Sequence, residues 1–293
     1  MYKDKSLLVP PDKKISLKNY DPCYTNDFKD KDSAKEQLEK DVEEMFELQD
    51  VFYADNSYSM LIVLQAMDTA GKDGLIKHVM RGLNPEGCVV HSFKQPSSEE
   101  LEHNFLWRHW KVVPKRGEIT IFNRSHYEEV LVTKVHPEYI LKQNIPGINS
   151  MDNVNNDFWQ ERYKQIRNFE RTLFQNGTIV IKFYLNLSKD EQKKRFLARI
   201  DDEHKNWKFS ESDVTERQYW DDYMKAYAEA ISNTSTEYAP WYIIPADNKW
   251  YSRLAVANIL KHTMKNLKLS YPKLDKEGLR RLNDAKFMLE NEK

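Results

Sequence analysis

The chain has 293 residues, enough for one large α/β domain or two compact ones. Charged residues make up 31% of it but the formal net charge is -1, so only a local cluster of Lys and Arg could bind a polyanion, and a nucleic-acid-binding protein is not expected. The two cysteines, Cys23 and Cys88, have neither metal-site nor redox spacing. The N-terminus lacks the apolar core of a signal peptide, and no apolar run approaches the roughly 18 residues of a membrane span. We therefore expect a cytoplasmic protein without membrane contact.

Apolar periodicity and turn residues predict a regular alternation of helices and strands. Residues 1–32 have no periodicity and predict an extended arm on the surface. After the arm, in chain order, the sequence predicts a helix over 34–53, a strand over 60–67, a helix from about 72 to 83, a turn over 84–87, a strand over 88–93, a helix near 97–111, a strand over 118–123, a helix over 152–175, a strand over 178–187, helical segments over 188–202 and 213–232, a strand over 241–246, and helices over 249–268 and 275–290.

This alternation predicts a three-layer α/β fold, in which helices cover both faces of a central parallel five-stranded sheet. We expect residues 33–293 to form a single domain with a helical lid at about 188–217. In such sheets a ligand binds beyond the carboxyl ends of the strands, so the segments that follow the strands are the ones to search for a site.

The segment AMDTAGKDG (66–74), after the first predicted strand, is close to a phosphate-binding loop, whose usual pattern is G-x-x-x-x-G-K-[ST]. Gly71 and Gly74 allow the backbone to approach a ligand, and the helix N-terminus that follows offers unpaired N–H groups to a phosphate. Lys72 would place a cation on the transferring phosphoryl group. Ala66 replaces the first glycine of the pattern. The order of strand, glycines, lysine and helix favours a phosphate site over a turn without a ligand.

The same loop contains two carboxylates, Asp68 and Asp73, and Asp73 replaces the hydroxyl residue of the usual pattern. Bare carboxylates would repel a phosphate. They are explained if they bind Mg²⁺, because this ion prefers oxygen ligands and bridges phosphates. The sequence therefore predicts a magnesium site at Asp68 and Asp73.

A second candidate segment, FNRSHYE (122–128), follows the third predicted strand. Arg124 is expected to emerge at the ligand face, where its guanidinium could bind a phosphate bidentately. Asn123 stands where many phosphate-loop enzymes carry an Asp that binds Mg²⁺. Glu128 could contact a nucleotide or pair with Arg124. The alternative for this stretch is a strand end followed by a capped helix with no ligand.

A third segment, residues 189–209, carries seven Lys and Arg residues against five acids. Arg195 and Arg199 share a helix face, and Lys205 and Lys208 flank Trp207. Taken alone, the segment is typical of a solvated helix. In a phosphate-loop enzyme a basic segment at this place would act as a lid, which excludes water and brings Arg to the developing charge.

Together these segments resemble the family-2 polyphosphate kinases. The resemblance is carried by AMDTAGKDG (66–74), FNRSHYEEVLV (122–132), KKRFLARIDDEHKNWKFS (193–210), RQYWDDY (217–223) and APWYIIPADNKW (239–250), and it covers roughly residues 30–268. It implies a phosphate-loop kinase fold, Mg²⁺, and phosphoryl transfer between inorganic polyphosphate and a nucleoside mono- or diphosphate. The sequence is most similar to the third class, whose single-domain members use both AMP and ADP, and Asn123 agrees with that class.

The resemblance also implies roles for individual residues. Asp68, Lys72 and Arg124 are the implied catalytic residues. Phosphate or nucleotide binding is implied for Thr69, Ala70, Gly71, Asp73, Gly74, Asn123, Glu128, the lid-helix residues Arg195 and Arg199, and the lid-tip residues Lys205 and Lys208. Helix position and charge alone suggest that Lys77, Arg81 and Lys94 line a groove for the polyphosphate chain.

Two other functions share parts of this pattern. An ATP-dependent nucleoside monophosphate kinase would have the fold and the lid, but it predicts a hydroxyl residue where this chain has Asp73. A non-catalytic phosphate or nucleotide sensor would fit the loop, but it does not require Lys72, Arg124 and the lid arginines together. The expected partners are polyphosphate, adenine nucleotides, with guanine nucleotides left open, and further copies of the chain in a dimer or tetramer.

Overall fold

The computed structural model describes residues 5–26, 28, 30–204 and 206–292. Its centre is a sheet of five strands in the order β2-β3-β1-β4-β5, and every neighbouring pair is parallel. The strands are β1 (Ser59–Ala66), β2 (Cys88–Ser92), β3 (Ile119–Asn123), β4 (Thr178–Asn186) and β5 (Trp241–Pro245). The predicted five-stranded parallel sheet is therefore confirmed.

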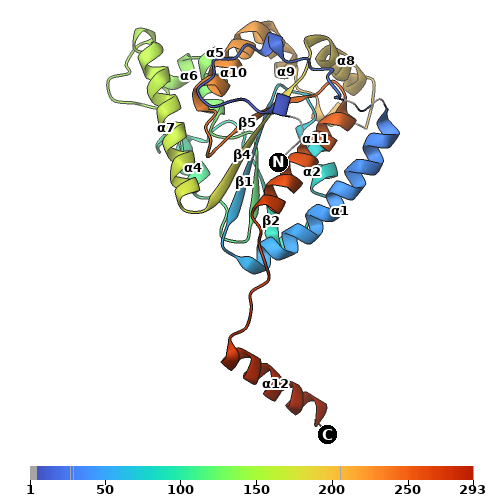
Figure 1. Cartoon of the computed structure of the whole chain (residues 1–293). Coiled ribbons are helices and arrows are strands. Elements are labelled where there is room, and N and C mark those ends of the chain that lie inside the picture. The colour runs from blue at the N-terminus through green and yellow to red at the C-terminus, as the bar shows by residue number, and fades with distance from the viewer. Residues whose placement is uncertain (1–4, 27, 29, 205, 293) are drawn as a thin grey trace.

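Helices cover both faces of this sheet (Figure 1). One face packs against α1 (Lys31–Asp55), α2 (Lys72–Val79) and α11 (Lys249–Asn266), and the other against α5 (Glu128–Val135), α7 (Asn156–Gln175) and α10 (Trp220–Thr234). The side chains of β1 alternate between the two cores: Met60 and Ile62 enter one, Leu61 and Val63 the other. This is why the central strand is apolar at successive positions.

The remaining helices are shorter or lie at the edges of the fold. They are α3 (Ser98–Leu101), α4 (Trp107–Trp110), α6 (Glu138–Leu141), α8 (Lys189–Ile200), α9 (Glu211–Glu216) and α12 (Lys276–Glu290). Single 3-10 turns occur at Lys5–Leu7, Leu17–Asn19, Pro85–Gly87, Met151–Asn153, Asn206–Lys208 and Arg217–Tyr219. Within the described parts of the chain, every helix is too short or too polar to cross a lipid bilayer.

Several predicted boundaries were wrong. The helix expected near 97–111 is two one-turn helices, because a capping box at Ser97 starts α3 and the Asn104 side chain accepts from the Leu106 N–H and turns the chain before α4. The helix expected to reach 83 ends at Val79, and α5 and α6 are absent from the predicted elements. The segment 213–232 is broken by the turn Arg217–Tyr219.

The N-terminal segment is anchored at the outer edge of β5. Leu8 forms an antiparallel bridge with Tyr242, and the Val9 N–H donates to the Trp241 carbonyl at 2.9 Å. The side chains of Leu7 and Val9 are buried. These contacts hold the start of the described chain against the sheet.

Candidate active site

The loop between β1 and α2 has an unusual backbone. Thr69 lies in the left-handed region at φ 63° and Gly71, the N-cap of α2, at φ 106°. Glycine adopts such angles freely, but a β-branched residue such as Thr69 does so at a cost of about 1–2 kcal/mol. Strain of this size persists where the surroundings fix the backbone, which is typical of functional loops.

Lys72 lies at the centre of this loop. Its Nζ donates to the carbonyls of Ala66 at 2.8 Å and Met67 at 3.5 Å, so the ammonium is held over the end of β1. Burial lowers the pKa of Lys72, and the nearby carboxylates of Asp68 and Glu128 oppose that shift. A phosphate bound here would compete with the loop carbonyls for the same three N–H donors.

The end of β3 brings its polar residues to the same place, because β3 is the neighbour of β1. Arg124 Nη2 donates to Asp68 Oδ1 at 2.7 Å, and Asn123 Nδ2 donates to Asp73 Oδ1 at 2.9 Å. Arg124 also has a left-handed backbone, at φ 63°. The structure thus joins two sequence-predicted segments in one site: each loop carboxylate is paired with a strand-end residue.

A fully buried polar cluster lies behind the segment that carries Arg124. Lys182 Nζ donates to Glu170 Oε2 at 2.6 Å, to the Tyr127 hydroxyl at 3.0 Å and to the Thr234 carbonyl at 2.7 Å. The Tyr127 hydroxyl donates to Glu170 Oε1 at 2.8 Å, and His126 lies 3.5 Å from the same atom. Burial alone would raise the pKa of the Glu170 carboxyl, but the charge of Lys182 lowers it. Burial lowers the pKa of the Lys182 ammonium to about 8. This ion pair fixes the turn between β3 and α5.

Arg195, for which the sequence predicts phosphate or nucleotide binding, contacts only protein groups here. Its Nη1 donates to the carbonyls of Thr69 and Ala70, its Nη2 to those of Ala246 and Asp247, and its Nε to Glu191 Oε1, at distances of 2.7 to 3.2 Å. These contacts use all five N–H groups of the guanidinium, so none is left for a phosphate. Arg195 instead ties the phosphate loop to the loop after β5.

Arg195→Ala is expected to lower kcat about tenfold, because four loop carbonyls lose a buried donor and the loop loses its fixed shape. Since all five N–H groups of the guanidinium already donate to protein oxygens, KM for the phosphate donor should change little, and Arg195→Lys should recover part of the rate. Initial rates over a range of donor concentrations measure both constants. A rise in KM that becomes smaller at high salt would instead indicate that Arg195 contacts the phosphate donor directly.

The remaining residues of the predicted lid are Arg199, Lys205 and Lys208. Arg199 Nη1 lies 3.7 Å from Asp213 Oδ2, which connects α8 with α9. Burial raises the pKa of Asp213 and Asp68 raises it further, so α9 approaches the loop carboxylate. Lys205 lies outside the described residues, and Lys208 is described only by its backbone, in the turn Asn206–Lys208.

The proposed groove residues are not arranged as the sequence suggested. Arg81 lies beyond the end of α2 and its Nη2 is 3.8 Å from Glu39 Oε1 of α1, so it does not extend a helical row from Lys77. Lys94 follows β2, with an exposed side chain and a carbonyl that accepts from Arg108 at 2.8 Å. Only Lys77 lies on the exposed face of α2 as expected.

Sequence reasoning missed Arg253, which α11 brings to α2. A Cβ on Gly74 would lie 3.7 Å from its Nη2, so the guanidinium lies beside the first turn after the loop. Burial lowers the pKa of the neighbouring His78, and the positive charges of Arg253, Arg81 and Lys77 lower it further. Lys77, Arg81 and Arg253 therefore form one basic surface. In the sequence, the indication of this position was only that Arg253 is a basic residue in the helix after the fifth strand.

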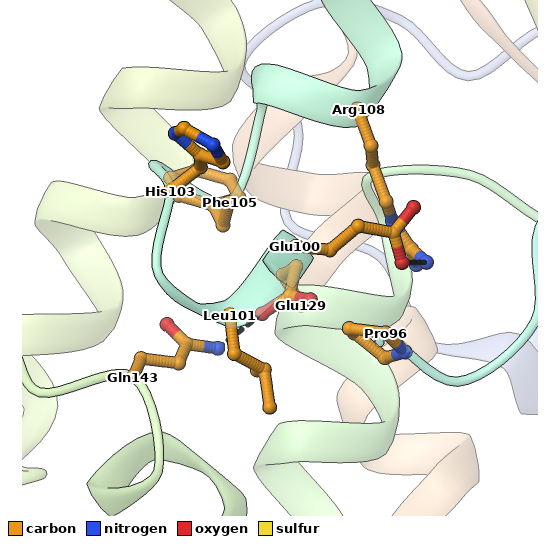
Figure 2. Close-up of a pocket in the computed structure, with 8 residues that line it drawn as sticks. All are labelled: Pro96, Glu100, Leu101, His103, Phe105, Arg108, Glu129 and Gln143. Carbon is orange, nitrogen blue, oxygen red and sulfur yellow. Dashed lines mark hydrogen bonds and ion pairs between the residues drawn. The ribbon is translucent and has the colours of Figure 1, made fainter. Parts of the chain in front are cut away.

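A small polar pocket lies between the segment after β2 and α5 (Figure 2). Arg108 Nη1 lies 3.3 Å from Glu100 Oε2, and Gln143 Nε2 donates to Glu129 Oε2 at 2.6 Å. Arg162 donates to the other end of Gln143. These hydrogen bonds and the ion pair link the two segments, although Arg162 Nη1 is buried without a hydrogen-bond partner in the described part of the chain.

These features together define a phosphate-loop kinase: a parallel sheet, a lysine-bearing loop that opens a helix, and an arginine at the end of the neighbouring strand. The chain belongs to the polyphosphate kinase 2 (PPK2) family, whose model matches residues 28–272. The predicted family resemblance is thus confirmed.

Individual relatives agree with this assignment. The chain is 49% identical over 270 residues to an ADP-polyphosphate phosphotransferase of Rhodopseudomonas palustris, covering 92% of each chain. It is 44% identical to an AMP/ADP-polyphosphate phosphotransferase of Meiothermus ruber, covering 92% of this chain and 95% of the relative. The crystal structure of polyphosphate kinase 2 from Arthrobacter aurescens superimposes with a TM-score of 0.85 at 40% identity, covering 96% of both chains.

Proposed function

We propose that this protein transfers phosphoryl groups reversibly between inorganic polyphosphate and AMP or ADP, and that it uses Mg²⁺. The observation that carries the proposal is the cluster at the ends of β1 and β3, where Lys72 and Arg124 lie beside Asp68 in a chain of the polyphosphate kinase 2 family. The choice of AMP and ADP is supported by the names of the two relatives that match most of the chain.

In the forward direction, a terminal phosphate oxygen of the nucleotide attacks the end phosphorus of polyphosphate. The bond from that phosphorus to the bridging oxygen breaks, and the shortened chain leaves with the electron pair. The attacking oxygen is already ionised at neutral pH, so the site needs no strong base. Lys72 and Arg124 would neutralise the charge on the transferring group and hold the two reactants in line.

The loop carboxylates fit Mg²⁺. Among the described residues, no group of three or more His, Cys, Asp or Glu side chains could hold a metal by itself. Magnesium in kinases, however, is usually bound by one or two carboxylates together with substrate phosphates and water. Asp68 and Asp73 supply carboxylates, and the buried oxygens Thr69 Oγ1 and Asn123 Oδ1 lack a hydrogen-bond partner within the described chain. Asp68 and Asp73 would hold Mg²⁺, which would supply positive charge against the phosphates.

The direct test incubates the protein with AMP, polyphosphate and Mg²⁺ in the absence of ATP and follows the formation of ADP and ATP. Both products are expected. Phosphorylation of AMP only when ATP is the donor would favour a nucleoside monophosphate kinase. Binding of polyphosphate or nucleotide with no transfer from either donor would favour a sensor.

Asp68→Asn should raise the Mg²⁺ concentration needed for half-maximal rate on the order of tenfold, equivalent to about 1.4 kcal/mol. The amide keeps an oxygen to accept from Arg124 but has no charge for the metal. Initial rates across a magnesium series measure the effect, with Asp152→Asn, an exposed acid in the turn Met151–Asn153, as the control. An unchanged magnesium dependence would remove Asp68 from the metal site.

The basic surface beside the loop gives a test of the polymeric donor. Lys77→Gln with Arg253→Gln should raise KM for long polyphosphate much more than for short chains, since only a long chain extends past the loop. The effect should shrink as salt rises, because exposed charges are screened within about 8 Å at physiological ionic strength. Lys164→Gln with Lys225→Gln removes two exposed lysines from helices on the other face of the sheet and is the matched control. Equal losses at both chain lengths would place the donor path elsewhere.

A further inference from the structure

The first turn of α8 places a buried amide against the phosphate loop. Gln192 is only 1% exposed, although most of its neighbours on α8 are charged. Its Nε2 donates to the Asp68 carbonyl at 3.1 Å, and its Oε1 accepts from Arg217 Nη1 at 2.5 Å. Arg217 also donates to the Lys189 carbonyl at 3.2 Å, which ties its guanidinium to the start of α8. The amide therefore joins α8, the turn Arg217–Tyr219 and the loop after β1.

The two partners of Gln192 fix which way its amide faces. A guanidinium only donates, so the amide oxygen must face Arg217. A backbone carbonyl only accepts, so the amide nitrogen must face Asp68. A carboxylate at this position could meet only the first requirement, and an ammonium only the second. The residue type at position 192 thus follows from its two contacts.

Gln192 belongs to a set of three side chains that donate to five successive carbonyls of the loop. Lys72 donates to the first two, Gln192 to the third, and Arg195, three residues later on α8, to the last two. The five carbonyls are those of Ala66, Met67, Asp68, Thr69 and Ala70. In a trans peptide the N–H that follows a carbonyl points the opposite way. Because α8 draws the last three carbonyls toward itself, the N–H groups of Thr69 and Gly71 point away from it, and no oxygen of these peptides is turned outward to repel an anion.

The carboxylate of Asp68 depends on this backbone contact for its position. It accepts from Arg124, but the two side chains are 30% and 42% exposed, and an ion pair open to water does little to fix its own geometry. The next residue, Thr69, has the strained left-handed backbone. The buried hydrogen bond from Gln192 therefore holds the main chain at the point where the loop turns and where Asp68 meets Arg124.

We propose that Gln192 is a positioning residue for phosphoryl transfer, which acts by holding the Asp68 carbonyl and so sets the place of the Asp68 carboxylate and its partner Arg124. Arg217 orients the amide for this task. The inference rests on the proposed function. Because the contact crosses from α8 to the loop, a displacement of α8 relative to β1 would also displace Asp68, so the loop responds to where this helix lies.

Gln192→Met tests the proposal, since it keeps the length of the side chain and removes both hydrogen bonds. The kcat with AMP and polyphosphate should fall on the order of tenfold. KM for either substrate should change by less than about twofold, because Gln192 acts only on the placement of the catalytic groups. Initial rates over a range of both substrates separate the two constants. A wild-type kcat, or a loss confined to KM, would overturn the positioning role.

Gln192→Glu separates the two ends of the amide. The carboxylate still accepts from Arg217 but cannot donate to the Asp68 carbonyl, so kcat should fall as far as in Gln192→Met. A wild-type kcat in this variant would overturn the proposal, because the contact with Asp68 would then be dispensable. If Gln192→Met fails to fold, Gln192→Glu decides alone, because it keeps the ion pair that joins α8 to the turn Arg217–Tyr219.

Gln49→Met is the matched control for loss of a buried amide. Gln49 of α1 is also 1% exposed, and its side chain donates to the Asn84 carbonyl at 3.0 Å and accepts from the Asn84 N–H at 2.6 Å. Asn84 lies just before β2, at the amino end of the sheet and away from the phosphate loop. This variant should lower the thermal unfolding midpoint about as much as Gln192→Met but keep the wild-type kcat. An equal loss of kcat in the control would reduce the effect to general destabilisation and overturn the proposal.

Combining Gln192→Met with Arg195→Ala tests whether the two side chains act on one loop shape. The double variant should lose little more rate than the slower single variant, because a loop that has already lost its shape has little more to lose. Losses that multiply would contradict an action through the same loop. Absence of transfer by the wild-type chain would refute the proposed function itself, whereas the role of Gln192 is refuted by an active wild type whose Gln192 variants are equally active.

Discussion

Lys72→Ala is expected to abolish phosphoryl transfer while the fold survives. One cation that contacts the transferring group is typically worth several kcal/mol in the transition state, or on the order of a hundredfold or more in rate. The side chain contributes only two hydrogen bonds to loop carbonyls in the folded chain, so stability should change little. Initial rates with AMP and polyphosphate, together with the thermal unfolding midpoint, measure the two effects.

Lys111→Ala serves as the control, because this exposed lysine contacts the Trp107 ring and lies outside the phosphate loop. Its rate should stay close to that of the wild type. A folded Lys72→Ala variant with near-normal turnover would contradict the assignment of the site. So would a variant that merely loses stability and regains full rate at low temperature.

Lys182→Met is expected to lower the free energy of unfolding by about 3–5 kcal/mol, because it leaves the Glu170 carboxylate buried without its main partner. Glu170→Gln should lower the free energy of unfolding by a similar amount, because it leaves the Lys182 ammonium buried without its carboxylate partner. Both side chains are fully buried in the cluster behind Tyr127. Urea unfolding at constant pH measures the change.

The double variant Lys182→Met with Glu170→Leu provides the decisive comparison. Replacing both charges by apolar side chains of similar size removes the need for pairing, so it should recover much of the stability lost in either single variant. Single variants that cost less than 1 kcal/mol, or a double variant whose loss equals the sum of the two, would show that the pair is not a coupled unit.

The sheet and the heart of the site could be predicted because they depend on local patterns. Each strand is a short apolar run, and the rule that ligands bind at the carboxyl ends of parallel strands places the Lys72 loop and Arg124 at the same edge of the sheet from the sequence alone. The pairing of β1 with β3 then brings Asp68 and Arg124 into contact. That strand pairing comes from the structure, because the sequence analysis predicts no strand order.

The support around the site could not be predicted, because it comes from contacts that leave no pattern. Arg195 donates to backbone carbonyls about fifty and more than a hundred residues away, at Ala246 and Ala70, and any residue type presents a carbonyl. Arg253 reaches the loop only because α11 packs against α2. The break between α3 and α4 depends on a single side-chain turn at Asn104, which apolar spacing does not report.

The short antiparallel contact between Leu8 and β5 has a consequence for how the chain behaves among copies of itself. β5 is a terminal strand of the sheet, and its outer row of backbone N–H and C=O groups would otherwise be open to strands of other molecules. The Val9 N–H donates to the Trp241 carbonyl, and the Ser235 hydroxyl donates to the Val9 carbonyl at 2.8 Å. Residues 5–10 thus protect the edge of β5 from pairing with strands of other molecules, and a chain shortened past Val9 is expected to aggregate through this exposed edge while it keeps its activity.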